Sequence, residues 1–198
     1  IGYADMLRSR KLDEEKAFVS ANYIFTEGKR LEAMAFRLLD IIVTKRMDIE
    51  KQKVNTEKLF SYLRELYGEY TQVKILCQYE PAVVLAESDL LKSVLINLVD
   101  NACKASKEGG RVEILGRKQK NGYLFAVKDY GMGIAEEEYD KITNAFYMVD
   151  KSRSRSKNGA GLGLALCAAV LELHESRILI ESTLGEGSDI GFVIPNKE

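Results

Sequence analysis

The chain has 198 residues, of which 46% are hydrophobic and 30% charged, so it can bury a core and is neither disordered nor fibrous. Its 29 Lys and Arg residues are balanced by 30 Asp and Glu, which argues against a globally basic nucleic-acid-binding protein. Three cysteines without C-x-x-C spacing indicate reduced thiols in place of a zinc or redox site. The sequence opens without methionine or a signal-peptide pattern, so we expect part of a longer protein, with any membrane segment elsewhere.

A long helix is predicted near the N-terminus, because residues 11–49 contain no proline and only one glycine, Gly28. Asp13 is suited to cap its start. Apolar residues follow at heptad-like spacings, at Ile24, Leu31, Met34, Leu38 and Ile41. Residues 1–10 resemble the end of a preceding helix, which predicts a hairpin that buries its seam against a second copy of the chain. One surface helix of a monomer is the alternative interpretation.

After about residue 52 the pattern changes to alternating strands and helices. Short β-branched or alternating runs predict strands at 73–79, 82–86, 111–116, 123–127, 178–180 and 190–194. Helices are predicted at about 56–70, 88–107 and 161–173. This order indicates an α+β or α/β sandwich, with helices layered on one face of a sheet.

The helix predicted at 88–107 carries a polar stripe beside its apolar face. Asn97, Asn101 and Lys104 are spaced by four and three residues, which places them on one side of the helix. Amide oxygens can ligate magnesium and a lysine ammonium can pair with phosphate oxygens, so the stripe suits a metal-bound polyphosphate. A polar stripe that is merely solvated is the alternative.

Three further segments are rich in glycine, in charged residues or in both. Asp129-Tyr130-Gly131-Met132-Gly133 follows a predicted strand, and its acceptor-only carboxylate suits an exocyclic amine such as adenine N6. The glycines of residues 159–163 open a predicted helix whose N-terminus can receive phosphates. Between them, residues 151–158 alternate four cations with small polar residues, as in a basic lid, a nucleic-acid patch or a solvated loop.

Together these segments resemble a sensor histidine kinase of the Bergerat-fold (GHKL) ATPase superfamily. Five motifs occur in the family's order: an N box at 97–104, a G1 box at 129–133, an F box and lid at 146–155, a G2 box at 159–164 and a last glycine turn at 185–188. The resemblance covers about residues 52–198. The opening residues resemble the stretch just after the phosphoacceptor histidine of the dimerisation domain.

The resemblance implies an α+β fold, a two-layer α/β sandwich preceded by a helical hairpin segment. Residues 1–50 would be part of the dimerisation and histidine phosphotransfer helices, without the acceptor histidine, and residues 51–198 the catalytic ATP-binding domain. The implied setting is the cytoplasmic portion of a bacterial membrane sensor, a homodimer through the hairpin. Its implied partner is the receiver domain of a response regulator, without nucleic acid, and any membrane contact is expected only through regions outside this chain.

The resemblance also implies roles for single residues. Asn101 would hold Mg²⁺, Asn97 and Lys104 would lie near the phosphates, and Asp129 would bind the adenine amino group of ATP. Lys151 or Arg153 in the lid would approach the γ-phosphate. The implied ATP-binding set is completed by Ala105, Gly131, Gly133, Ile134, Gly159, Gly161, Leu162, Gly163, Leu164 and Ser188. Ala105 stands where the family often has an aromatic residue, and the F box carries Thr143-Asn144-Ala145 in place of the usual pattern, so altered lid docking and modest affinity are expected.

The predicted activity is that of an ATP-dependent protein-histidine kinase whose acceptor histidine lies upstream of Ile1. The chain alone would then bind ATP without autophosphorylation, because its single histidine, His174, sits within the nucleotide domain and is interpreted as structural. Relatives that hydrolyse ATP or phosphorylate serine carry a glutamate at the place of Asn97, and a carboxamide cannot act as that general base. The alternative is a non-catalytic, nucleotide-sensing dimeric interaction module.

Overall fold

The computed structural model describes residues 2–9, 12–44, 48–68, 72–149 and 161–196. Contacts divide the chain into two compact units, Ile1–Asp40 and Ile41–Glu198, which we call the helical unit and the α/β unit. This division falls inside the long N-terminal helix, and the domain boundary expected after residue 50 stays a prediction. Among the described residues, no helix combines the length and the hydrophobicity needed to span a bilayer.

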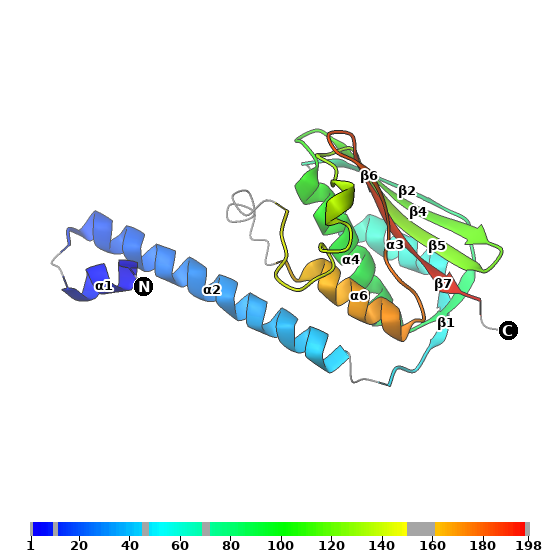
Figure 1. Cartoon of the computed structure of the whole chain (residues 1–198), viewed down its shortest axis with the longest axis horizontal. Helices are drawn as coiled ribbons and strands as arrows, with labels where there is room; N and C mark the ends of the chain where they lie inside the picture. The colour runs from blue at the N-terminus through cyan, green and yellow to red at the C-terminus, as the bar shows by residue number, and fades with distance from the viewer. Residues whose placement is uncertain (1, 10–11, 45–47, 69–71, 150–160, 197–198) are drawn as a thin grey trace. The chain divides into compact units, whose positions relative to one another are not determined.

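The helical unit is built from α1 (Gly2–Ser9) and most of α2 (Glu14–Thr44). The carboxylate of Asp13 accepts a hydrogen bond from the backbone N–H of Lys16 at 2.8 Å, which confirms the predicted start of the long helix. The rings of Tyr3 and Tyr23 lie 4.5 Å apart, so α1 folds back along α2 as a short hairpin (Figure 1).

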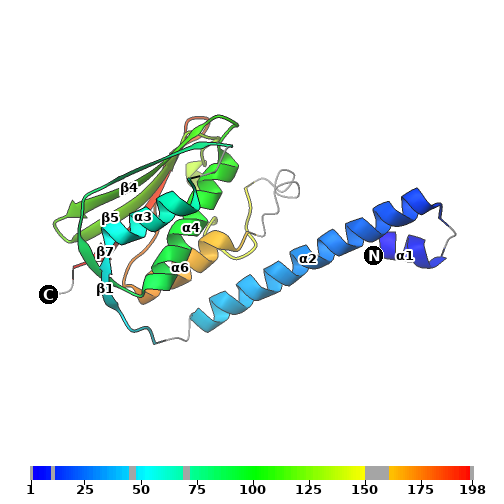
Figure 2. The ribbon, with the colours of Figure 1, turned by 180° about the vertical axis from the view of Figure 1, so that it is seen from behind.

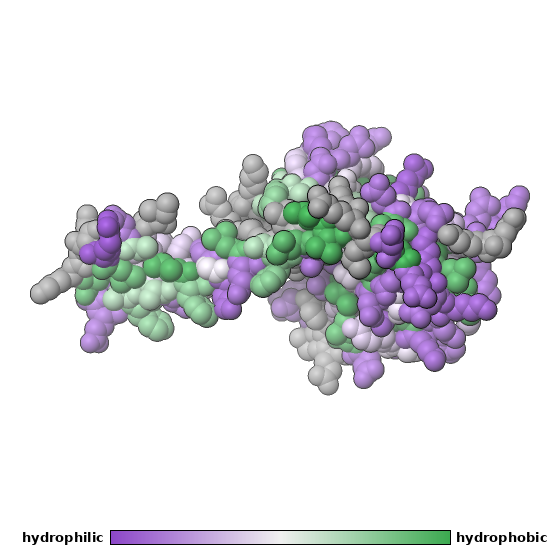
Figure 3. Space-filling model, turned by 90° about the horizontal axis from the view of Figure 1, so that it is seen from below, coloured by the Kyte–Doolittle hydropathy of each residue, from purple (hydrophilic) through white to green (hydrophobic). Residues whose placement is uncertain are grey.

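Much of the apolar surface of α2 faces solvent. Of the predicted seam, Ile24 is 38% and Leu31 59% exposed, while the side chains of Met34, Leu38 and Ile41 lie outside the described set. The other large exposed residues of this helix up to Asp40 are Phe18, Val19, Tyr23, Phe25, Phe36 and Leu39. Figure 3 shows apolar residues gathered over the hairpin. Several exposed apolar residues on one helix are typical of an interaction surface.

The α/β unit is a two-layer sandwich, as predicted. Its sheet has the order β2-β4-β5-β7-β6, in which β2 and β4 are parallel and the other neighbours antiparallel. The strands are β2 (Lys74–Tyr79), β4 (Arg111–Gln119), β5 (Gly122–Asp129), β6 (Leu179–Thr183) and β7 (Gly187–Pro195). The helices α3 (Thr56–Leu66), α4 (Ser88–Ala105) and α6 (Gly163–Leu173) cover one face (Figures 1 and 2).

Sequence patterns located every strand of this sheet, although not their order. A two-stranded ribbon of β1 (Gln52–Asn55) and β3 (Val83–Ala86) stands apart from it, and β1 was missed. Only Val54 of β1 is apolar and buried, so the strand has too little hydrophobic pattern to be recognised. The predicted helix at 56–70 ends earlier, at Leu66, and a short 3₁₀ helix, η1 (Glu136–Glu138), follows the G1 box.

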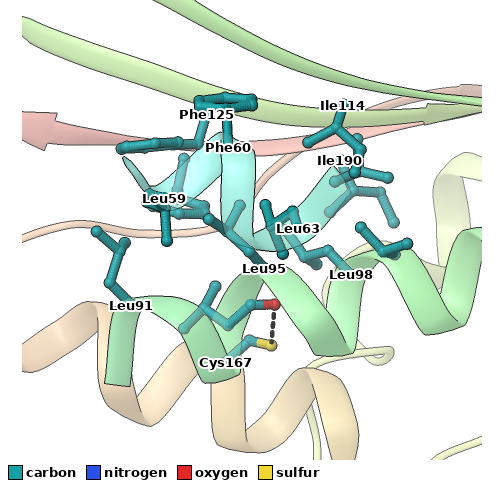
Figure 4. Close-up of a cluster of buried hydrophobic side chains, with 14 of the residues drawn as sticks. Leu59, Phe60, Leu63, Leu91, Leu95, Leu98, Ile114, Phe125, Cys167 and Ile190 are labelled. Atoms are coloured by element: carbon teal, nitrogen blue, oxygen red, sulfur yellow. Dashed lines mark hydrogen bonds between the residues drawn. The ribbon is translucent and has the colours of Figure 1, made fainter. Parts of the chain in front are cut away.

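The core lies between the sheet and the three helices (Figure 4). Phe125 stacks between Phe60 of α3 and Phe192 of β7, with ring centroids 6.1 and 5.2 Å apart. All six residues of the apolar stripe predicted on α4 are buried: Leu91, Val94, Leu95, Leu98, Val99 and Ala102. The cysteines are free thiols, and burial raises the pKa of Cys103 to about 11 and that of Cys167 to about 12.

The single histidine is part of this scaffold. His174 is 2% exposed at the C-terminal end of α6, and its Nδ1 lies 2.8 Å from the carbonyl oxygen of Val170. Its Nε2 accepts a hydrogen bond from the backbone N–H of Glu87 at 3.0 Å, so the ring is neutral and ties α6 to the start of α4. Burial lowers the pKa of the imidazole.

This geometry predicts a stability loss on mild acidification. Below a pH of about 6.5 the unfolded chain binds a proton at His174 that the folded state resists, so the free energy of unfolding falls by at most about 1.4 kcal/mol per pH unit. Urea unfolding measures the free energy of unfolding of the native protein and of His174→Gln at pH 7.5 and 5.5. The difference between the two proteins should be smaller at pH 5.5. Parallel pH profiles of the two proteins would contradict this role.

Candidate functional site

The polar stripe of α4 lies beside its buried face, as predicted. Asn97 and Asn101 are half-buried and Lys104 is exposed. The Nδ2 group of Asn97 donates a hydrogen bond to the carbonyl oxygen of Ser93 at 2.9 Å, which fixes the orientation of the carboxamide. Its Oδ1 atom is thereby available to face the neighbouring helix.

The start of α6 approaches both asparagines. A Cβ atom at Gly163 would lie 3.0 Å from Oδ1 of Asn97 and 3.9 Å from Oδ1 of Asn101, so a glycine allows this close approach. The residue before the helix, Leu162, is buried and supplies no side-chain cap. The first turn of α6, with the positive end of the helix dipole, therefore lies beside the two carboxamides, an arrangement suited to an anion. The side chain of Leu164 packs against the core.

Asp129 ends β5 and is 5% exposed on the helix-covered face of the sheet. Its Oδ1 atom accepts a hydrogen bond from the backbone N–H of Gly131 at 2.8 Å. Burial raises the pKa of this carboxyl, while hydrogen bonds from Gly131 and Ser188 act in the opposite direction. A buried carboxylate with remaining acceptor capacity strongly favours a ligand that brings an N–H donor.

Glycine contacts join the other motifs around Asp129. A Cβ atom at Gly131 would lie 2.4 Å from the carbonyl oxygen of Ala105, so the G1 turn sits directly against the end of α4. A Cβ atom at Gly187 would lie 2.2 Å from the carbonyl oxygen of Asp129, which brings the last glycine turn to the same place. Gly133 meets Thr183 of β6 in the same way.

One contributor to this site was missed in the sequence. Ser182 of β6 accepts a hydrogen bond from the backbone N–H of Ile134 at 2.8 Å and donates to the carbonyl oxygen of Gly187 at 2.7 Å. It thus connects the G1 turn to the last glycine turn. The available signal was a polar residue at the position of β6 that pairs with Ser188.

The loop after η1 closes the edge of β6. The hydroxyl of Tyr139 donates to the carbonyl oxygen of Ser182 at 2.8 Å and accepts from its backbone N–H at 2.9 Å. Further along, the N–H of Phe146 donates to the carbonyl oxygen of Gly161 at 2.9 Å, so the F box adjoins the G2 box. Lys151, Arg153 and Gly159 lie outside the described residues.

Comparison with known proteins identifies the sequence family. Residues 86–198 match the family described as "Histidine kinase-, DNA gyrase B-, and HSP90-like ATPase". Sensor protein SrrB of Staphylococcus aureus is 32% identical over 184 residues, which cover 88% of this chain and 31% of that protein. The chain therefore spans about a third of the length of the curated relatives that it matches.

Solved structures share the fold. The catalytic domain of histidine kinase ThkA is 27% identical, with a TM-score of 0.65 over 74% of this chain and 96% of that one. ThkA in complex with response regulator protein TrrA has a TM-score of 0.75 at 24% identity, over 99% of this chain and 56% of that one. Full-length ShkA in complex with AMPPNP has a TM-score of 0.73 at 24% identity, over 100% of this chain and 43% of that one.

These comparisons confirm the resemblance to sensor histidine kinases that the five motifs indicated. The matched segment contains α4, the G1 turn, α6 and the last glycine turn, which are the parts that the structure brings together. The chain belongs to the family of histidine kinase-, DNA gyrase B- and HSP90-like ATPases.

Proposed function

We propose that this chain is the cytoplasmic kinase part of a bacterial two-component membrane sensor. It binds Mg-ATP and transfers the γ-phosphoryl group to a histidine upstream of Ile1. The observation that carries the proposal is the convergence of three elements: the carboxamides of α4, the start of α6, where Leu162 supplies no side-chain cap, and the buried carboxylate of Asp129. The similarity to a protein named as a sensor supports the signalling role.

Each part of the site has a proposed task. Asp129 accepts a hydrogen bond from the adenine N6 amine, between the G1 turn and the last glycine turn. Asn97, Lys104 and the first turn of α6 face the phosphates, with the rest of the G2 box and Lys151 or Arg153 closing from the lid.

The donor set fits a magnesium ion that is carried in by the nucleotide. The described residues contain no group of three His, Cys, Asp or Glu side chains that could hold a metal. Magnesium keeps several waters and takes phosphate oxygens, so one protein ligand, the Oδ1 atom of Asn101, is sufficient. When bound, the ion neutralises charge on the phosphates. Asn97 adds no general base, which fits attack by an imidazole in place of water.

The helical unit is proposed to supply the dimer. We assign residues 1–50 to the dimerisation and phosphotransfer helices and residues 51–198 to the ATP-binding domain. The exposed apolar residues of α2 support self-association, because contact with a second copy would remove their side chains from water. The ThkA neighbour is bound to a response regulator, and we propose a partner of that class here.

Replacing Asp129 by asparagine should change the preferred base. The carboxamide loses the charged acceptor for N6 of ATP but can donate to O6 of inosine triphosphate (ITP). We expect the Kd of ATP to rise about ten- to hundredfold, with ITP binding retained or improved, as measured by calorimetry with magnesium. Asp189→Asn, which alters a half-buried carboxylate on the neighbouring strand, is the matched control. An unchanged preference for ATP in Asp129→Asn would contradict the assignment.

Phosphoryl transfer requires a longer chain that includes the upstream residues. With radiolabelled Mg-ATP it should acquire acid-labile, alkali-stable phosphate on a histidine, and Asn101→Ala should lower the labelling rate by about a hundredfold or more. Asn121→Ala, in the turn between β4 and β5, should label normally. ATP binding without any labelling of the longer chain would favour the non-catalytic interaction module.

The dimer is tested on the chain as it stands. Sedimentation equilibrium should show a dimer, and Leu31→Glu should shift it to monomer because the substitution places a charge on the apolar surface of α2. Glu32→Ala, which removes an exposed ion-pair partner of Lys29 on the same turn, is expected to leave the dimer intact. A native chain that stays monomeric at high micromolar concentration would refute this proposal.

A further inference from the structure

Tyr130 is held by a group of charged side chains on the face of the sheet that the helices leave open. Its hydroxyl donates a hydrogen bond to Oε1 of Glu113 at 3.0 Å, and Nε of Arg111 forms an ion pair with the same oxygen at 2.9 Å. The guanidinium of Arg111 lies 4.4 Å from the ring centroid, and Nζ of Lys128 lies 5.4 Å from it. A 40% exposed tyrosine is therefore fixed by one hydrogen bond and two cation–π contacts.

Arg111, Glu113 and Lys128 together form what we call the Tyr130 clamp. Strand alternation places the clamp on the opposite face of the sheet from Asp129. Val112 and Val127 are buried under the helices, whereas the next residues, Glu113 and Lys128, are partners in the β4–β5 register and lie on the opposite, open face. Asp129 continues the buried series, and Tyr130, in contact with Glu113 and Lys128, continues the open one. The side chains of Asp129 and Tyr130, at the end of β5, are therefore held on opposite faces of the sheet.

The backbone between them is confined as well. A Cβ atom at Gly187 would lie 2.2 Å from the carbonyl oxygen of Asp129 and 2.7 Å from Cα of Tyr130, so β7 supports this peptide directly. On the next residue, the N–H of Gly131 donates to Oδ1 of Asp129. A movement of Tyr130 would therefore change both the direction of the carboxylate and the position of one of its hydrogen-bond donors.

We infer that Tyr130 is a positioning residue for nucleotide selection: its clamp by Arg111, Glu113 and Lys128 sets the direction in which the Asp129 carboxylate meets the base. The inference rests on the proposed binding of adenine by Asp129. A ligand hydrogen bond depends on placement to within about 0.5 Å, so loosening the strand end weakens the contact with N6 while phosphate contacts made by α4 and α6 persist.

The test compares ATP with ITP, which lacks the 6-amino group, on the complete 198-residue chain with magnesium. Native protein should bind ATP about ten- to hundredfold more tightly than ITP. Tyr130→Ala should lower this ratio at least about fivefold by weakening ATP binding, with the Kd of ITP changed less than about twofold. Tyr130→Phe, which loses only the bond to Glu113, should give an intermediate ratio.

Tyr62→Ala is the matched control. Tyr62 on α3 is also 40% exposed and also has a lysine over its ring, with Nζ of Lys92 5.5 Å from the centroid, but it lies on a different element from the G1 turn. Its removal should leave the ATP-to-ITP ratio unchanged.

Several outcomes would overturn the inference. A native ratio retained in Tyr130→Ala shows that the clamp does not orient Asp129, and equal losses for ATP and ITP show a general structural effect. If Tyr130→Ala does not fold, a native ratio in Tyr130→Phe refutes the inference in its place. A native chain that binds both nucleotides equally would remove the adenine contact on which the inference rests, and one that binds neither would remove the proposed function as well.

Discussion

The packing of α4 against the sheet is the interaction on which the rest of the α/β unit depends. Seven apolar side chains of this helix are buried, a contribution on the order of 10 kcal/mol before the entropy of ordering is counted. That burial fixes the rotation of the helix about its axis. The rotation of α4 therefore directs Asn97 and Asn101 of the polar stripe toward the start of α6. The rotation of α4 about its axis therefore determines both which residues enter the hydrophobic core and where the polar stripe lies.

Backbone proximity, more than side-chain chemistry, completes the site. The G1 turn touches the end of α4 at Gly131, the last glycine turn touches Asp129 at Gly187, and α6 touches α4 at Gly163. A side chain at any of these glycines would place its Cβ atom too close to a backbone carbonyl oxygen or, at Gly163, to the amide oxygen of Asn97. Glycines at these positions let the G1 turn and the last glycine turn approach Asp129 closely, and let the start of α6 approach the carboxamides of α4.

The sequence was informative wherever a local pattern determines the structure. The two stripes of α4, the cap at Asp13 and the strands of the sheet follow from periodicity and turn chemistry. Strand order could not be predicted, because pairing such as that of β5 with β7 joins residues some 60 positions apart without a local signal. β1 was not predicted because it contains only one apolar residue, Val54. The bonds of Ser182 and the clamp on Tyr130 were equally hidden, since they depend on which strands become neighbours.

The two hydrogen bonds of Tyr139 have a consequence for solubility. β6 is the outer strand of the sheet, and such a strand presents unpaired N–H and C=O groups to which another chain can add. At Ser182 both groups are taken by a single phenol hydroxyl, which replaces a neighbouring strand without extending the sheet. The loop after η1 therefore protects the sheet against edge-to-edge aggregation, and a chain cleaved in this loop would expose a template for intermolecular β-pairing.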